Sequence, residues 1–147
     1  MKYMALLLLV AAMAACNNNS TTKLKAEELS KVQADTARYT TIAWVDSIHQ
    51  NIGTLTIGEK VEIKYRVKNT GQYPLILTNV VASCGCTVPS YTKEPIAPGA
   101  EGVITASFDS NRSPHPGEFR KTVGVTANTK PAAFTELVFS GLLKEAK

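Results

Sequence analysis

The sequence predicts an all-β fold, an immunoglobulin-like β-sandwich of about seven strands, preceded by a signal peptide and a short tether. Three observations support this prediction. From residue 42 onward apolar and polar residues alternate with a period of two, and Gly, Pro and Asn recur at short intervals. The apolar fraction of 44% is typical of a chain that buries a core. With 147 residues, the chain has room for one such domain, which we expect over 42–147.

The first residues have the pattern of an export signal. Lys2 supplies a positive charge, and 4–15 form an apolar run that is too short to cross a membrane as a helix. The run ends in Met13-Ala14-Ala15-Cys16, which resembles the processing site of bacterial lipoproteins. We therefore expect residues 1–15 to be a lipoprotein signal peptide and Cys16 to carry the lipid. The alternative is cleavage after Ala14, which would release a secreted protein.

Residues 16–41 are expected to form a lipidated tether. Leu24, Ala26, Leu29 and Val32 permit a short amphipathic helix within it, although their apolar stripe is thin. Positions 17–22 contain no acidic residue that would resemble a surface-export signal. The predicted location is the cell envelope, with the protein lipid-anchored and facing the periplasm.

The strands are predicted from alternation and from turn residues. The plainest is 61–68, where Val, Ile, Tyr and Val alternate with charged residues. The segment 75–82 is more continuously apolar, which favours a strand in the interior of a sheet that runs on into 83–88. A polar turn is expected at 47–51. The other predicted strands are 40–46, 52–57, 102–108, 119–127 and 134–143.

Several short motifs in this order carry a family resemblance. They are Val67-Lys-Asn-Thr-Gly71, Leu75-Ile-Leu77, Val80-Val-Ala-Ser-Cys-Gly-Cys-Thr87, Ile96-Ala-Pro-Gly99, Phe108-Asp109, Gly117, Lys121-Thr-Val123 and Val125-Thr-Ala-Asn128. Together they resemble the bacterial domain of unknown function 1573, over about residues 52–143. The resemblance implies an immunoglobulin-like sandwich similar to those of major sperm protein and cilia-associated proteins. It also implies an interaction role and no known enzyme activity.

The composition argues against catalysis and against nucleic-acid binding. The net charge of +4 is scattered, with no basic block to follow a phosphate backbone. His49 and His115 are the two histidines, and neither lies in a catalytic or zinc-binding motif. We expect a protein without enzyme activity, catalytic residues, a metal site of the usual kind or a cofactor.

Cys84 and Cys86 are the remaining candidate for chemistry. Residues i and i+2 of a flat strand have Cα atoms about 6.6 Å apart, at the upper limit for a disulfide. Gly85 allows an unusual φ, so a bend there would bring the pair together. Three interpretations stay open: a structural bond or two buried thiols, a redox-active pair, or a site for a soft metal such as Cu(I).

The preferred functional hypothesis is a lipid-anchored envelope protein that acts as a protein-binding or assembly module. Its expected contact surface is the strand edges and the Cys84 loop, because open edges can accept a partner strand. The expected partner is an envelope protein or peptide. The alternative is a thiol redox or soft-metal-handling protein that uses Cys84 and Cys86.

Overall fold

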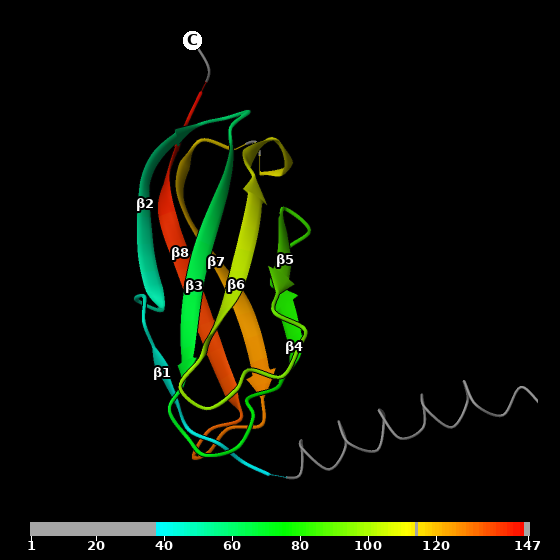
Figure 1. Cartoon of the computed structure of the whole chain (residues 1–147). Coiled ribbons are helices and arrows are strands. Elements are labelled where there is room, and N and C mark those ends of the chain that lie inside the picture. Colours follow the sequence, from blue (N-terminus) through cyan, green and yellow to red (C-terminus); the bar gives the residue numbers. More distant parts are fainter. Residues whose placement is uncertain (1–37, 114, 146–147) are drawn as a thin grey trace, which may run out of the picture. The chain divides into compact units, whose positions relative to one another are not determined.

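Two four-stranded β-sheets make up the computed structural model, which describes residues 38–113 and 115–145 (Figure 1). One sheet has the order β1-β3-β6-β5 and the other has the order β2-β8-β7-β4. The strands described are β1 Ile42–Trp44, β2 His49–Thr56, β3 Lys60–Asn69, β4 Leu77–Ala82, β5 Thr87–Tyr91, β6 Glu101–Asp109, β7 Gly117–Ala127 and β8 Phe134–Lys144. The predicted all-β sandwich is confirmed. In these ranges, no helix is long and apolar enough to cross a membrane.

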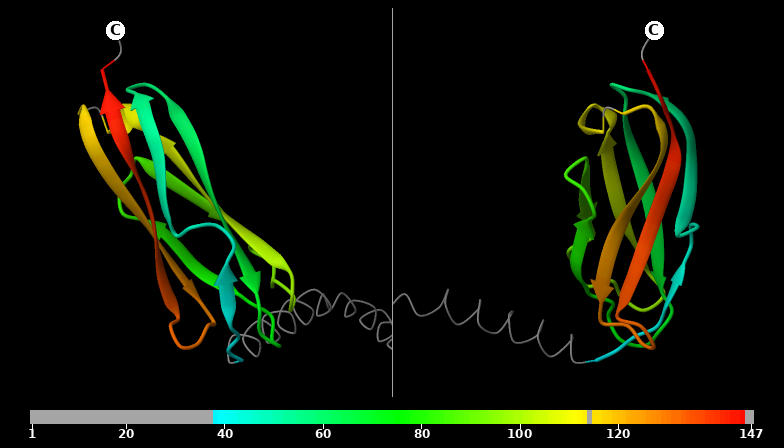
Figure 2. Two further views of the ribbon diagram at one scale, coloured as in Figure 1. Left: turned by 90° about the vertical axis from the view of Figure 1, so that its left-hand side faces the viewer. Right: turned by 180° about the vertical axis from the view of Figure 1, so that it is seen from behind.

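Two of the connections between the sheets determine which strands lie at the edges. After β1 pairs with β3, it passes to the other sheet and continues as β2, parallel to β8. After β4 pairs with β7, the four residues 83–86 bring it back to the first sheet as β5, beside β6. The edge strands β4 and β5 therefore lie next to each other on one side of the sandwich (Figures 1 and 2).

The structure has one strand more than predicted. The expected run of 75–82 into 83–88 is broken by the connection at 83–86, and Thr87–Tyr91 forms β5 in the other sheet. The expected polar turn at 47–51 is shorter, because β2 begins at His49. Polar residues at an edge such as β2 can face water, so polarity alone did not locate the turn.

The prediction that 75–82 lies in the interior of a sheet is wrong, because β4 is an edge strand. Two of its apolar residues precede the strand: Leu75 pairs with Ile96 in an isolated bridge, and Ile76 follows it. Within β4, Val80 faces the core whereas Val81 is 55% exposed. The apolar run therefore combines a buried loop with one apolar residue on the surface.

The core follows the alternation read from the sequence. In β3, Ile63, Tyr65 and Val67 are at most 2% exposed, while the charged residues between them face solvent. Three phenyl rings from β6, β7 and β8 pack at its centre, with Phe108 and Phe119 stacked at a centroid distance of 5.1 Å. The hydroxyl of Tyr65 donates to the carbonyl of Val138 at 2.9 Å, which ties the two sheets together.

Buried asparagines hold the end of the sandwich at which the described chain begins. Asn69 joins the first strands to the loop before β6, and its side chain accepts a hydrogen bond from Thr40 at 2.8 Å. Asn128 accepts from the backbone of Ile76 and donates to the carbonyl of Arg38. Thr40 is 3% exposed, so the last residues of the predicted tether pack into this end of the domain.

Candidate functional site

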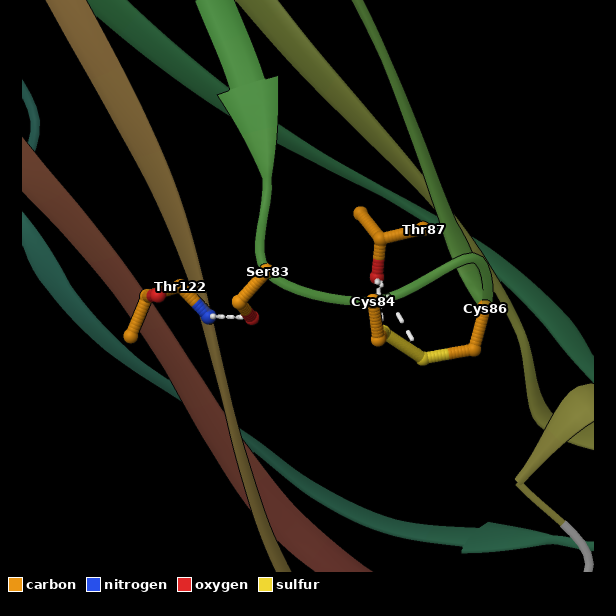
Figure 3. The surroundings of a disulfide bond; sticks show 5 residues. All are labelled: Ser83, Cys84, Cys86, Thr87 and Thr122. Atoms are coloured by element: carbon orange, nitrogen blue, oxygen red, sulfur yellow. Dashed lines mark hydrogen bonds between the residues drawn. A yellow bond between two sulfur atoms is a disulfide. The ribbon is translucent and has the colours of Figure 1, made fainter.

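The predicted cysteine pair is joined in a disulfide at the turn between β4 and β5 (Figure 3). The Cα atoms of Cys84 and Cys86 are 5.3 Å apart, closer than a flat strand would place them. The N–H of Thr87 donates to the carbonyl of Cys84 at 3.3 Å, which closes the turn. The chain therefore bends at Gly85, as the sequence led us to expect.

The reason expected for that bend is not correct. The glycines with positive φ are at 53, 58, 99 and 117, so Gly85 turns without the left-handed conformation. A Cβ on Gly85 would meet the Nη2 atom of Arg112 at 3.4 Å, an ordinary van der Waals distance. The turn follows from the hydrogen bonds at its two ends and does not require glycine.

Those two ends are fixed to opposite sheets. Ser83 donates its N–H to the carbonyl of Thr122 on β7 at 3.0 Å, and its hydroxyl accepts from the N–H of Thr122 (Figure 3). The N–H of Asp109 on β6 donates to the carbonyl of Cys86 at 3.0 Å. The disulfide therefore lies in a short bridge that is already held at both ends.

The two cysteine residues differ in exposure, and the same hydroxyl lies near both of their sulfur atoms. Cys84 is half-buried, whereas Cys86 is only 5% exposed. The Oγ1 atom of Thr87 lies 3.7 Å from the sulfur of Cys84 and 3.9 Å from that of Cys86. Cys84 is therefore the more exposed of the two residues, and the hydroxyl can donate to either sulfur.

A hollow of about 370 Å³ lies beside Cys86, with charged and apolar walls. Lys60 forms an ion pair with Asp109 at 3.3 Å across one wall, and Arg112 and Glu62 also line the hollow. Partial burial alone would raise the pKa of Asp109, but the backbone of Asn111 and the ammonium of Lys60 outweigh it and lower that pKa. Asp109 therefore stays ionised and neutralises Lys60, and Arg112 is the other cation that lines the hollow.

The open edge of β5 offers few hydrogen-bond donors to a partner strand. The bonds from Thr92 to Val103 and from Asp109 to Cys86 show that the even-numbered residues of β5 pair with β6. The backbone groups of 87, 89 and 91 must then face outward. Thr87 uses its N–H within the turn and Pro89 has none, so only Tyr91 of these three offers a donor. Proline at such a position is a common protection of an edge.

The edge of β4 is more open and has an apolar surface beside it. Because Ser83 pairs with Thr122, the alternation along β4 directs the backbone groups of Val80 and Ala82 toward the open edge. On the outer face, Val81 lies opposite Gly124 of β7.

The ring of Phe134 covers that glycine, since a Cβ on Gly124 would lie only 2.9 Å from it. Phe134 is 58% exposed and Val81 is 55% exposed. We refer to Val81, Gly124 and Phe134 as the apolar strip. On the neighbouring edge strand, Val88 is 60% exposed. The sequence contains the residues of the apolar strip, but only the registers of β4, β7 and β8 bring them together.

Two further sequence predictions concern the lipidation site and a soft-metal site. Cys16, the predicted lipidation site, lies outside the described residues. No group of three or more His, Cys, Asp or Glu side chains that could hold a metal ion occurs within 38–113 and 115–145. A soft metal would bind the thiolates of Cys84 and Cys86, and these sulfurs are joined to each other in the structure.

These features define an immunoglobulin-like, PapD-like β-sandwich with a disulfide at one sheet-to-sheet crossing. Residues 42–143 match the family described as "Protein of unknown function (DUF1573)", and the chain belongs to this family. The resemblance seen in the sequence is thereby confirmed. No curated protein sequence matches the chain.

Solved structures show the same fold at low sequence identity. A protein of unknown function from Porphyromonas gingivalis W83 is 17% identical with a TM-score of 0.64, over 74% of this chain and 49% of that one. The present chain thus spans about half of that protein. The ASH or PapD-like domain 7 of human CEP192 is 12% identical with a TM-score of 0.59, over 74% and 89% of the two chains. The secreted serine protease VesC from Vibrio cholerae is 10% identical with a TM-score of 0.54, over 78% and 25%.

Proposed function

We propose that this protein is a lipid-anchored envelope protein that binds another protein or a peptide through the β4 edge. In this proposal it faces the periplasm, binds no nucleic acid and catalyses no reaction. The observation that carries the proposal is the apolar strip beside an edge whose backbone groups have no partner strand among the residues that the structure describes. A strand added to β4 would gain backbone hydrogen bonds, and its alternate side chains could cover Val81 and Phe134.

The anchor part of the proposal rests on the leader and on Cys16. The described chain begins at Arg38, at the end of the sandwich opposite the C-terminal end of β8 (Figure 1). Strand β4 starts near the end of the sandwich where Arg38 lies and runs away from it. The turn at 83–86 follows the other end of β4. A lipid at Cys16 would attach the domain to the membrane through the part of the chain that leads into Arg38.

The anchor is tested by changing Cys16→Ser in the full chain and fractionating cells. We expect the wild-type protein in the membrane fraction and the variant in the soluble fraction, because stable attachment needs the acyl chains. A wild-type protein that is already soluble and begins at Ala15 would show that the anchor is wrong. This outcome leaves the binding proposal intact.

Binding is tested by placing a photo-crosslinking amino acid at position 81 or 134 of the envelope-localised protein. The control is position 103, because Val103 is an exposed valine on the outer face of the other sheet. We expect one adduct of the same mass from 81 and 134 and none from 103. Introducing Val81→Lys should abolish the adduct formed from position 134 without changing the urea midpoint, because Val81 is exposed. Equal labelling at all three positions, or no adduct at 81 and 134, would contradict the proposal.

A further inference from the structure

We propose that the Cys84–Cys86 disulfide is a thiol-exchange site, in which an external thiolate attacks the sulfur of Cys84 and Cys86 is the leaving sulfur. This inference goes beyond binding at the β4 edge and does not depend on it. The co-reactant supplies two thiols, either as one protein with two neighbouring cysteines or as two molecules of a small thiol.

Accessibility decides which sulfur is attacked. A thiolate must reach the sulfur directly to form a mixed disulfide, and the neighbouring residues control that approach. Cys84 is half-buried at the margin of the core, beside the exposed residues Ser83 and Gly85, whereas Cys86 is 5% exposed and belongs to the core itself. Attack at Cys84 is therefore favoured, and the electron pair of the broken bond goes to Cys86.

The surroundings of Cys86 suit a departing thiolate. The hydroxyl of Thr87, 3.9 Å from the sulfur of Cys86, can donate a hydrogen bond to the thiolate as it forms. Arg112 lines the same hollow as Cys86, and its guanidinium approaches Gly85. The other charges there are Lys60, which is paired with Asp109, and the carboxylate of Glu62. A nearby cation lowers the pKa of a thiol, and a thiol of lower pKa leaves faster.

The exchange balances in two steps. In the first, the external thiolate forms a bond to the sulfur of Cys84, the Cys84–Cys86 bond breaks, and Cys86 becomes a thiolate. In the second, the other external thiolate attacks the external sulfur of the mixed disulfide and releases Cys84 as a thiolate. The two external thiols are oxidised to a disulfide, and Cys84 and Cys86 take up two electrons and then two protons from water.

The disulfide should contribute little to the stability of the fold, which argues against a purely structural role. It closes a ring between residues two positions apart, and such a short loop restricts the unfolded chain far less than a long one. The turn is held independently by Ser83 on β7 and by Cys86 on β6. Reduction should therefore leave the sandwich folded, which an exchange site requires.

The test uses the mature full-length protein with reduced glutathione as the probe. Samples are quenched with N-ethylmaleimide while the fluorescence of Trp44 shows that the protein is folded, and each cysteine is then assigned by peptide mass analysis. We expect glutathione on Cys84 and the maleimide on Cys86, with at least about tenfold preference for this arrangement. Glutathione mainly on Cys86, or no exchange until the protein unfolds, would overturn the proposal.

Substitutions test whether Arg112 and Thr87 assist the departure of Cys86 as a thiolate or only support the structure of the turn. Arg112→Gln should slow exchange several-fold, whereas Arg120→Gln, an exposed arginine on β7, should leave the rate unchanged. Thr87→Val should also slow exchange, and Thr87→Ser should restore it because the hydroxyl returns. Unchanged rates in Arg112→Gln and Thr87→Val would show that neither residue assists. A rate loss in Thr87→Val that Thr87→Ser fails to restore would count against the hydroxyl.

Discussion

Changing Asn69→Ala should be among the most destabilising single substitutions in the domain. Its amide group donates to the carbonyls of Tyr73 and Ile96, and its oxygen accepts from the hydroxyl of Thr40 and the N–H of Gly71. Asn69 itself is fully buried. Each such bond contributes about 1 kcal/mol net, so losing these four costs about 4 kcal/mol, and the hydroxyl of the buried Thr40 loses its acceptor.

Urea unfolding followed by the fluorescence of Trp44, the single tryptophan, measures this loss. With a slope of about 1.5 kcal/mol per molar urea, the midpoint should fall by about 2 to 3 M. Asn79→Ala is the matched control, because Asn79 is an exposed asparagine on β4, and it should change the stability by less than about 0.5 kcal/mol. A loss below about 1 kcal/mol in Asn69→Ala would refute the idea that this side chain holds the loops together.

Three further predictions concern ionisation and backbone space. Burial raises the pKa of Tyr65 from 10.0 to about 12, so the folded state keeps a proton that the unfolded state releases. Urea unfolding at several pH values should show stability falling between pH 10 and pH 12, and Tyr65→Phe should reduce that fall. Hydrogen bonds from Arg66 lower the pKa of Asp46 below 3.8, so their stabilisation is present above that pH and is lost as the pH falls through the lowered value. Acid titration of Asp46→Asn should lack this component. By thermal unfolding, Gly71→Ala should lower the Tm by roughly 5 °C or more, because a Cβ there would lie 2.7 Å from a backbone nitrogen, whereas Gly85→Ala should change it by less than about 2 °C.

The features that the sequence predicted correctly depend on local pattern. Alternation places Ile63, Tyr65 and Val67 on one face of β3 whatever strand lies beside it, and the buried residues confirm that face. The bend between Cys84 and Cys86 was likewise foreseeable, because it involves residues two positions apart. Local geometry limits such arrangements to a few, so a single sequence is enough to predict them.

The features that it missed depend on partners that are distant in the chain. Asn69 is buried because Thr40 and Ile96, 29 and 27 residues away, bring their polar groups to it. The position of β4 at an edge depends on where the chain leaves the sheet, which hydrophobicity does not indicate. The apolar strip requires the registers of β4, β7 and β8 at once. Asn69 and Ile96 do lie in two of the motifs that carry the family resemblance, but those motifs do not show which residues contact each other.

The turn at 83–86 follows directly on β4, so the exchange site adjoins the proposed binding edge, and the anchoring of the turn makes the two sites separable. Ser83 is bonded to Thr122 and Cys86 to Asp109 through backbone groups that do not involve sulfur. Breaking the disulfide should therefore leave β4 paired with β7, and Val81 should keep its place beside Phe134. Conversely, Val81→Lys alters an outward side chain three residues before Cys84 and leaves both sulfurs in place. If reduction nevertheless abolished the crosslink from position 81, the backbone bonds at the two ends would be too weak to hold the edge, and the disulfide would itself be part of the binding surface.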